Sequence, residues 1–424
     1  MHLDIDSHNA SGLSKHEKRF EFLVGQLNDA GIDASAVVER LSAFQVAIPS
    51  WALGTGGTRF ARFPGGGEPR NLEEKIADVG LIHALTRTAG AISLHIPWDI
   101  PEDAHAIREL AASHDLRFDA VNSNTFQDQS DQEHSYKFGS LCHMNASVRQ
   151  QAIEHNLAVI EYGKDLGSRS LTVWLADGAG FPGQHNFRHA LFNTRDSLRQ
   201  IYAGLPADWR LFIEYKPYEP NFYATVIQDW GTSHFLAQSC GERAHCLVDL
   251  GHHLPNTNIE QIVATLLAVG RLGGFHFNDS KFGDDDLTVG SIKPYQLFLI
   301  FHELVWGMAN NLADNPPISY MIDASHNLKD PLEDLMQSLE SILEAYARAL
   351  TIDHVALDAA QMDNDVLAAE AILQAAFRTD VRPLLRESRL RTGGALDPIG
   401  VYRDSTARKQ LIRERGDKTI ATGL

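Results

Sequence analysis

Short β-rich runs and longer helical patterns alternate eight times along the chain, and this alternation constrains the fold more than any other feature. In the run NIEQIVATLLAVGRLG, Asn258 stands where an N-cap is expected, directly before an apolar repeat of helical spacing. Repeated strand–helix units are typical of a (β/α)₈ TIM barrel, an α/β fold with a closed parallel sheet. An open doubly wound sheet shares the alternation, but no GxGxxG sequence follows the first predicted strand. The eight predicted strands span 44–51, 92–98, 117–126, 170–178, 210–218, 245–253, 273–280 and 318–327.

The barrel pattern accounts for most, but not all, of the 424 residues. With 44% hydrophobic residues, the chain can bury one large core that carries extensions at both ends. We therefore predict three parts: an N-terminal helical segment (1–43), a (β/α)₈ barrel that holds the functional site (44–350) and a C-terminal helical extension (351–424).

The chain is acidic, with a formal net charge of −18. Proteins that bind nucleic acid or anionic membranes carry a basic surface, so we expect neither partner. Three unevenly spaced cysteines are too few for a disulfide framework or a thiolate metal site, which suits a reducing compartment. The sequence has no signal-peptide core and no apolar run of membrane-spanning length, so we expect a soluble cytoplasmic protein.

Polar residues stand at the carboxyl ends of four successive predicted strands. The functional site of a TIM barrel lies at this face, so these residues are the first candidates. Glu214 and Lys216, two positions apart, share the inward face of strand five, where a plain ion pair is the alternative interpretation. The next three strands end in further acids and imidazoles, namely Asp249, His252, His276 and Asp323. Ionised carboxylates that meet at one barrel mouth need a cation.

The acidic loop HFNDSKFGDDDL (276–287) adds further ligands at the same face. Taken alone, three consecutive aspartates are most simply a solvated loop, but the four converging strands favour a metal loop. One predicted cage takes one ligand from each strand: Glu214, Asp249, His276 and Asp323. A second predicted ion is held by His252, Asp284 and Asp286, with Asp249 shared between the ions and Asp285 pointing away. Oxygen-rich ligation with some imidazole favours Mn²⁺, Co²⁺ or Mg²⁺.

Five segments carry a resemblance to a known family. They are WALGTGGTRFARFPG (51–65), SLHIPWD (93–99), LVDLGHH (247–253), GGFHFNDSKFGDDDL (273–287) and MIDASHN (321–327). The chain resembles the L-rhamnose isomerases of the broad-specificity bacterial type, which are relatives of xylose isomerase, and the likeness continues through RTGGALDP (391–398). The resemblance implies a homotetrameric, metal-dependent aldose–ketose isomerase that converts L-rhamnose to L-rhamnulose by a hydride shift between C1 and C2.

The resemblance also assigns roles to residues. The first cage is implied to hold a structural metal and the second a catalytic metal, with Mn²⁺ expected and Co²⁺, Mg²⁺ or Zn²⁺ as alternatives. A sugar is implied to lie against Lys216 and four ring side chains, and Phe60 to enter the pocket of a neighbouring subunit. The four ring side chains are those of His95, Trp98, Phe126 and Trp174.

Three residues are predicted to be catalytic, namely His95, Lys216 and Asp323. His95, oriented by Asp99, is expected to assist opening of the sugar ring. Lys216 is expected to hydrogen-bond the sugar oxygen O1 as negative charge grows there, and Asp323 to exchange a proton.

Other functions stay open at this point. A sugar 3-epimerase on the same barrel needs one metal and two facing carboxylates, and has no need of Lys216 or a second-metal loop. A non-catalytic sugar-binding protein does not require seven potential ligands. A metal-dependent DNA-repair endonuclease is disfavoured by the acidic charge balance.

Overall fold

The structure, a computed structural model, describes residues 3–55, 63–220, 222–311, 316–325 and 328–420. Eight parallel strands close into a barrel in the order β1-β11-β10-β9-β6-β4-β3-β2, which confirms the predicted TIM-barrel fold. The strands are β1 (Ala47–Pro49), β2 (Ala91–Ile96), β3 (Arg117–Ser123), β4 (Ser170–Val173), β6 (Arg210–Glu214), β9 (Ala244–Asp249), β10 (Leu272–Phe277) and β11 (Ser319–Ile322).

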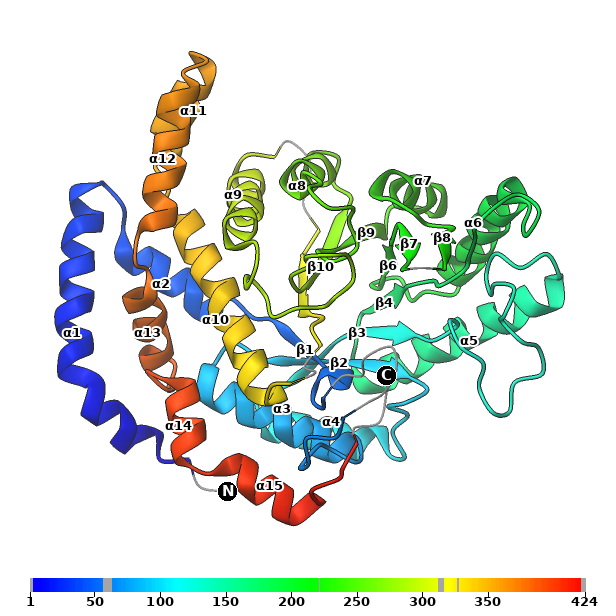
Figure 1. Ribbon diagram of the computed structural model, residues 1–424, viewed down its shortest axis with the longest axis horizontal. Coiled ribbons are helices and arrows are strands. Elements are labelled where there is room, and N and C mark those ends of the chain that lie inside the picture. The colour runs from blue at the N-terminus through cyan, green and yellow to red at the C-terminus, as the bar shows by residue number, and fades with distance from the viewer. Residues whose placement is uncertain (1–2, 56–62, 221, 312–315, 326–327, 421–424) are drawn as a thin grey trace.

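Each barrel strand is followed by a long helix that packs outside the barrel (Figure 1). Asn258 caps one of them as predicted, because its side chain accepts a hydrogen bond from the Gln261 amide at 3.1 Å. The eight helices are α3 (Leu72–Thr86), α4 (Ala104–Ser113), α5 (Ala146–Leu166), α6 (Phe187–Ala203), α7 (Trp230–Cys240), α8 (Ile259–Ala268), α9 (Pro294–Asn310) and α10 (Pro331–Leu350).

The predicted strands overran the carboxyl ends of the observed ones. Strand five was predicted to reach residue 218, but β6 ends at Glu214. Beyond that point the backbone leaves the barrel, because the Lys216 amide donates to Ile227 O at 3.0 Å in a separate hairpin. This hairpin belongs to a small sheet of β5 (Gly178–Ala179), β8 (Tyr223–Thr225) and β7 (Tyr218–Glu219).

The apolar core has an inner and an outer part. Inside the barrel, Ala120, Phe212 and Leu247 form a small buried cluster, as expected for the layered interior of this fold. The outer and larger part lies between the strands and the surrounding helices, where β-branched and leucine side chains are buried. A filled interior leaves the polar strand ends as the place for chemistry.

Further helices lie before and after the barrel. α1 (Ile5–Asp29) and α2 (Ala34–Ala43) precede it, after which a short 3₁₀ turn, η1 (Ser50–Ala52), follows β1. Asn9 joins α1 to the C-terminal region by two hydrogen bonds, to Gly394 O at 2.9 Å and from the Leu396 amide at 2.8 Å. The C-terminal helices are α11 (His354–Met362), α12 (Val366–Arg378), α13 (Arg382–Arg391), α14 (Pro398–Asp404) and α15 (Ala407–Arg415).

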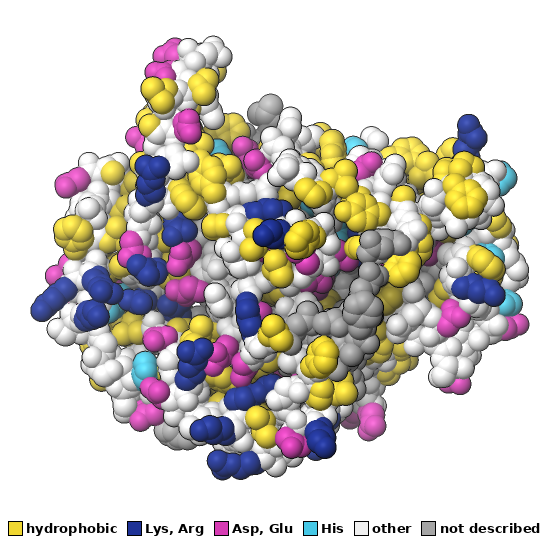
Figure 2. Space-filling model, viewed as in Figure 1, with side chains coloured by type: hydrophobic (Ala, Val, Ile, Leu, Met, Phe, Trp, Pro, Cys, Tyr) yellow, Lys and Arg dark blue, Asp and Glu magenta, His cyan; other side chains and the backbone are white. Residues whose placement is uncertain are grey.

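Two features of the C-terminal region stand out in the figures. α15 folds back onto the barrel, where Arg415 Nη1 lies 2.7 Å from the buried Asp78 Oδ2 on α3. By contrast, α11 and α12 form an arm that projects from the body and carries hydrophobic side chains on its surface (Figures 1 and 2). Within the described residues, no helix combines the length and the apolar character that crossing a membrane requires.

Candidate metal centre and sugar site

Four side chains from adjacent strands meet at the carboxyl-terminal mouth of the barrel. Each lies at or next to a strand end: Glu214 closes β6, Asp249 closes β9, His276 is the penultimate residue of β10 and Asp323 directly follows β11. One possible ligand atom from each lies within 4.8 Å of the others. The structure thus assembles the first predicted cage. Adjacent parallel strands bring these residues together because their carboxyl ends share one rim.

This cluster fits a divalent cation. Asp249 is fully buried, yet its Oδ2 atom has no hydrogen-bond partner among the described residues, as expected for an atom that serves a metal. Burial raises the pKa of Asp249, and burial together with nearby carboxylates raises the pKa of Asp323 to about 7. Burial also opposes ionisation of Glu214, but His276 and His252 outweigh it and lower the pKa of Glu214. Three carboxylates and one imidazole suit Mn²⁺, Co²⁺ or Mg²⁺.

The residues of the second predicted cage lie beside the first. His252 Nε2 lies 3.0 Å from Asp284 Oδ1, and its Nδ1 lies 3.2 Å from Glu214 Oε1. Asn278 Nδ2 donates to Asp249 Oδ1 at 2.9 Å and to Asp286 Oδ1 at 3.4 Å. Among the described residues, however, this second set does not meet the 4.8 Å spacing of the first.

The acidic loop turns two of its aspartates inward. Asp284 and Asp286 have positive φ angles of 55° and 43°, a left-handed conformation uncommon for residues other than glycine. Burial and the neighbouring carboxylates, chiefly Asp284, raise the pKa of Asp286 well above its usual range. Asp285 turns to its own loop instead, where it accepts a hydrogen bond from Ser280 Oγ at 2.6 Å. The loop therefore places the carboxylates of Asp284 and Asp286 beside the four-ligand cluster.

Aromatic rings form a wall beside the cluster. The His95 ring centroid lies 4.5 Å from that of Trp98 and 5.5 Å from that of Phe126. Phe126 in turn lies 4.8 Å from Trp174, and Lys216 Nζ lies 5.1 Å from the Trp174 ring centroid. The structure brings together all five residues predicted to surround a sugar. Phe60, the sixth predicted substrate contact, lies outside the described residues.

Asp99 was predicted to orient His95, but the structure shows that it contacts the backbone of His95 and not the ring. Asp99 Oδ2 accepts a hydrogen bond from the backbone amide of His95 at 2.8 Å, while Asp99 Oδ1 accepts one from Lys75 Nζ at 2.6 Å. His95 Nδ1 has no hydrogen-bond partner among the described residues. Burial lowers the pKa of His95 to about 4, so the ring is neutral near pH 7. Asp99 thus fixes the backbone at the end of β2, where the ring is held by its aromatic neighbours.

Lys216 is held between two carboxylates. Its Nζ atom lies 2.8 Å from Glu219 Oε1 and 2.5 Å from Asp284 Oδ2. Burial disfavours the charged ammonium, but Asp284 and Glu219 outweigh this effect and raise the pKa of Lys216. Lys216 is therefore a fixed, charged hydrogen-bond donor at the edge of the metal cluster.

Sequence reasoning missed several residues that position the site. Trp51 Nε1 donates to Asp323 Oδ1 at 2.9 Å, and Asn278 links Asp249 to Asp286. Both could have been found by position, because Trp51 lies two residues beyond β1 and Asn278 lies two residues after His276. No local pattern marks Glu219, because its contact with Lys216 depends on the hairpin after β6.

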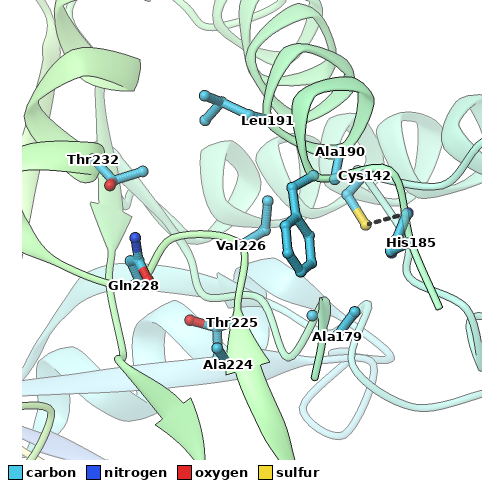
Figure 3. A pocket seen from close by; sticks show the side chains of 12 residues that line it. Cys142, Ala179, His185, Ala190, Leu191, Ala224, Thr225, Val226, Gln228 and Thr232 are labelled. Atoms are coloured by element: carbon cyan, nitrogen blue, oxygen red, sulfur yellow. Dashed lines mark hydrogen bonds between the residues drawn. The ribbon is translucent and has the colours of Figure 1, made fainter. Parts of the chain in front are cut away.

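A separate cavity of about 290 Å³ lies beside the β5–β8–β7 sheet (Figure 3). Apolar side chains from α6 and β8 supply much of its lining, and the described predicted site residues are not among its walls. Cys142 Sγ lies 4.0 Å from His185 Nε2 at one side. Burial raises the pKa of Cys142 well above its usual range, which favours the protonated thiol. This cavity therefore lies apart from the candidate site.

Comparison with known proteins places the chain among sugar isomerases. It is 52% identical over 411 residues to a probable sugar isomerase of Rhizobium meliloti, covering 97% of this chain and 95% of that protein. It is 51% identical over 419 residues to a probable sugar isomerase of Mesorhizobium japonicum, covering 99% and 97%. The chain belongs to this sugar isomerase family. No family model matches the sequence.

More distant matches support membership of this sugar isomerase family in the wider xylose isomerase-like superfamily. A xylose isomerase of Thermus thermophilus is 26% identical over 240 residues, which cover 52% of this chain and 60% of that protein. A xylose isomerase domain protein of Alicyclobacillus acidocaldarius has a TM-score of 0.51 at 14% identity, covering 73% of this chain and 99% of that one. D-allulose 3-epimerase of a Methylomonas species has a TM-score of 0.50 at 13% identity, covering 72% and 97%. These two structures show the shared barrel fold.

Proposed function

We propose that this family member is an aldose–ketose isomerase that depends on a divalent metal. The observation that carries the proposal is the meeting of a four-ligand cluster, a fixed lysine and an aromatic wall at one barrel mouth. Names of the relatives with about 50% identity support the reaction class. Glu214, Asp249, His276 and Asp323 would hold one ion. A bound divalent ion would polarise the sugar oxygens at C1 and C2, so that hydrogen can move between the two carbons.

The chain's own groups have distinct tasks in this reaction. Lys216 would donate a hydrogen bond to O1 as negative charge develops there. The His95 ring is neutral near pH 7, because burial lowers its pKa to about 4. It would accept the proton of the anomeric hydroxyl and pass it to the ring oxygen as the C1–O5 bond breaks. Asp323, with one oxygen held by Trp51, would take part in proton transfer between the two sugar oxygens.

The aromatic wall would select and orient the sugar. Trp98, Phe126 and Trp174 would pack against the apolar C–H faces of the sugar and exclude water. We propose L-rhamnose as the aldose, on the resemblance of the sequence segments described above, with L-rhamnulose as the product. We further propose two ions per chain, most favourably Mn²⁺, the second held by His252, Asp284 and Asp286 beside the first.

A ketose 3-epimerase is the second candidate. Among the described residues, only one group of four possible ligands lies within 4.8 Å of one another. This observation favours an epimerase, because an epimerase needs only one ion. An epimerase inverts C3 of a ketose and does not interconvert aldoses and ketoses. The products therefore distinguish the two reactions.

A substrate panel tests the proposal. Purified protein loaded with Mn²⁺ is incubated separately with L-rhamnose, other aldoses and the matching ketoses, and products are separated by chromatography. We expect L-rhamnose to yield L-rhamnulose, chelation to abolish this conversion and Mn²⁺ or Co²⁺ to restore it. Activity confined to C3 epimerisation of ketoses would replace the proposal with the second candidate. Full activity after verified removal of metal would contradict both.

We also propose that four copies of the chain assemble, the number that the resemblance of the sequence segments implies. The α11–α12 arm projects from the body, and hydrophobic side chains lie on its surface (Figure 2). Four of its apolar side chains are each at least three-quarters exposed, and a second copy can cover them. These side chains are Val355, Met362, Val366 and Leu367. Light scattering after size exclusion should give four chains for the wild type and fewer for the Val366→Asp, Leu367→Asp double variant. If the variant has the same mass as the wild type, the arm is not part of the interface between copies.

A further inference from the structure

A second cavity, of about 400 Å³, opens at the amino-terminal mouth of the barrel, opposite the metal cluster. Arg210 begins β6 and Glu214 ends it, so the two mouths are separated by about 13 Å of extended strand. The volume of this cavity falls within the range of small-molecule sites. Its lining is unusually basic for a chain with a net charge of −18, because it contains Arg117, Arg169 and Arg210 against a single acid, Asp119.

The arginines follow a regular pattern along the barrel. Five adjacent strands, β3, β4, β6, β9 and β10, each have an arginine as their first residue or directly before it. Two of the five stabilise loops: Arg243 Nη1 donates to Pro206 O at 2.7 Å, and Arg271 Nη1 donates to Gly241 O at 2.8 Å. The other three line the cavity.

The positive charge in the cavity is incompletely balanced. Arg169 pairs loosely with Asp208 at 3.7 Å, where both side chains are well exposed. Within the described part of the chain, neither Arg117 nor Arg210 has a carboxylate within 4.0 Å. The half-buried Arg210 instead donates to Pro317 O and lies with its guanidinium carbon 4.9 Å from the Phe212 ring centroid. Both arginines line the cavity, where their guanidinium groups can bind an anion.

The rest of the lining combines hydroxyl and amide groups with apolar side chains, among them Ala47, Phe118 and Ile318. Ser170, Ser319 and Gln45 face the same cavity from β4, β11 and the segment before β1. Ser319 Oγ donates to Asp119 Oδ1 at 3.3 Å, which holds that carboxylate on one side of the cavity. Arginines bind phosphate through paired N–H donors, whereas hydroxyl and amide groups hydrogen-bond the hydroxyls of a polyol.

We propose that this cavity is a second ligand site that binds a phosphorylated sugar, with the phosphate on Arg117 and Arg210 and the polyol toward Ser170 and Ser319. The site is independent of the proposed catalytic reaction, because it lies at the other mouth and shares no residue with the metal cluster. A phosphorylated sugar fits better than free phosphate, because a phosphate ion alone would fill only a small part of a cavity of about 400 Å³, and Phe118 and Ile318 offer apolar surface to the C–H faces of a sugar.

Calorimetric titration of the metal-loaded, full-length protein tests the site, with glucose 6-phosphate, inorganic phosphate and glucose as probes. We expect one arginine-dependent site per chain for glucose 6-phosphate. Arg117→Gln and Arg210→Gln should each raise its dissociation constant at least about tenfold, the loss expected for a charge-assisted contact. Arg413→Gln, which removes the same charge from an exposed position on α15, should bind like the wild type. Inorganic phosphate should bind more weakly at the same site.

Isomerase activity should be unchanged in all of these variants, because none of them alters the catalytic mouth. Arg117 is exposed, so its replacement carries the test even if Arg210→Gln lowers stability. Asp119→Asn, which removes the opposing charge, should bind glucose 6-phosphate no more weakly than the wild type. The proposal is overturned by the absence of saturable binding, by unchanged affinity in Arg117→Gln, or by equal affinity for inorganic phosphate.

Discussion

Asp249→Asn is expected to lose bound metal and to lower isomerase turnover more than about 100-fold. Replacing groups that only orient a metal ligand costs about 10–100-fold, so loss of a ligand shared by both proposed ions should cost more. The barrel should remain folded, because the asparagine side chain can still accept from the Gly251 amide, which now donates to Asp249 Oδ1 at 2.7 Å. Metal analysis of dialysed protein and initial rates with L-rhamnose measure the two effects.

Asp284→Asn is a comparison variant in which we expect only part of the bound metal to be lost. It leaves the four-ligand cluster intact and removes one ligand of the second proposed ion, together with one of the two carboxylates that hold Lys216. We expect two ions per chain in the wild type, one in Asp284→Asn and fewer than one in Asp249→Asn. Asp358→Asn, which removes an exposed carboxylate on α11, should match the wild type in both measurements. Wild-type metal content in Asp249→Asn would contradict the assignment of the metal centre.

Lys216→Met is expected to lower kcat by about 10²–10³-fold while metal stays bound, because it removes a fixed donor to the oxygen that gains charge. The change in KM should be much smaller, since the donor acts mainly in the transition state. The methionine preserves most of the side-chain volume beside Trp174. Steady-state kinetics with L-rhamnose, together with metal content, separates this effect from loss of the metal.

Lys281→Met is the matched control, because it removes the same charge from an exposed position on the acidic loop. It should retain wild-type kcat. Lys216→Arg should recover little activity, because the planar guanidinium cannot take the place of an ammonium held between Glu219 and Asp284. An unaltered kcat in Lys216→Met would contradict the catalytic role, and Lys216 would then be only a structural partner of Asp284.

The sequence alone was sufficient to predict the barrel and the meeting of the first set of candidate metal ligands. Strand–helix alternation is a local signal, repeated eight times, and a parallel sheet with that connectivity closes in few ways. Once the strands are ordered, their carboxyl ends must share a rim, so Glu214, Asp249, His276 and Asp323 are brought together by topology. Side-chain identity at strand ends therefore predicts this cluster without knowledge of any contact.

Only the tertiary structure decided how the second set of residues is arranged. The positions of His252, Asp284 and Lys216 depend on loop and hairpin backbone, whose course after a strand end follows from hydrogen bonds between distant segments. The same holds for Asp99, which proved to bind the His95 backbone rather than its ring. The basic cavity also needed the fold, because its arginines lie as much as 93 positions apart and meet only where β3, β4 and β6 begin. Local patterns specify elements and strand ends, whereas contacts between loops depend on packing that no short stretch of sequence encodes.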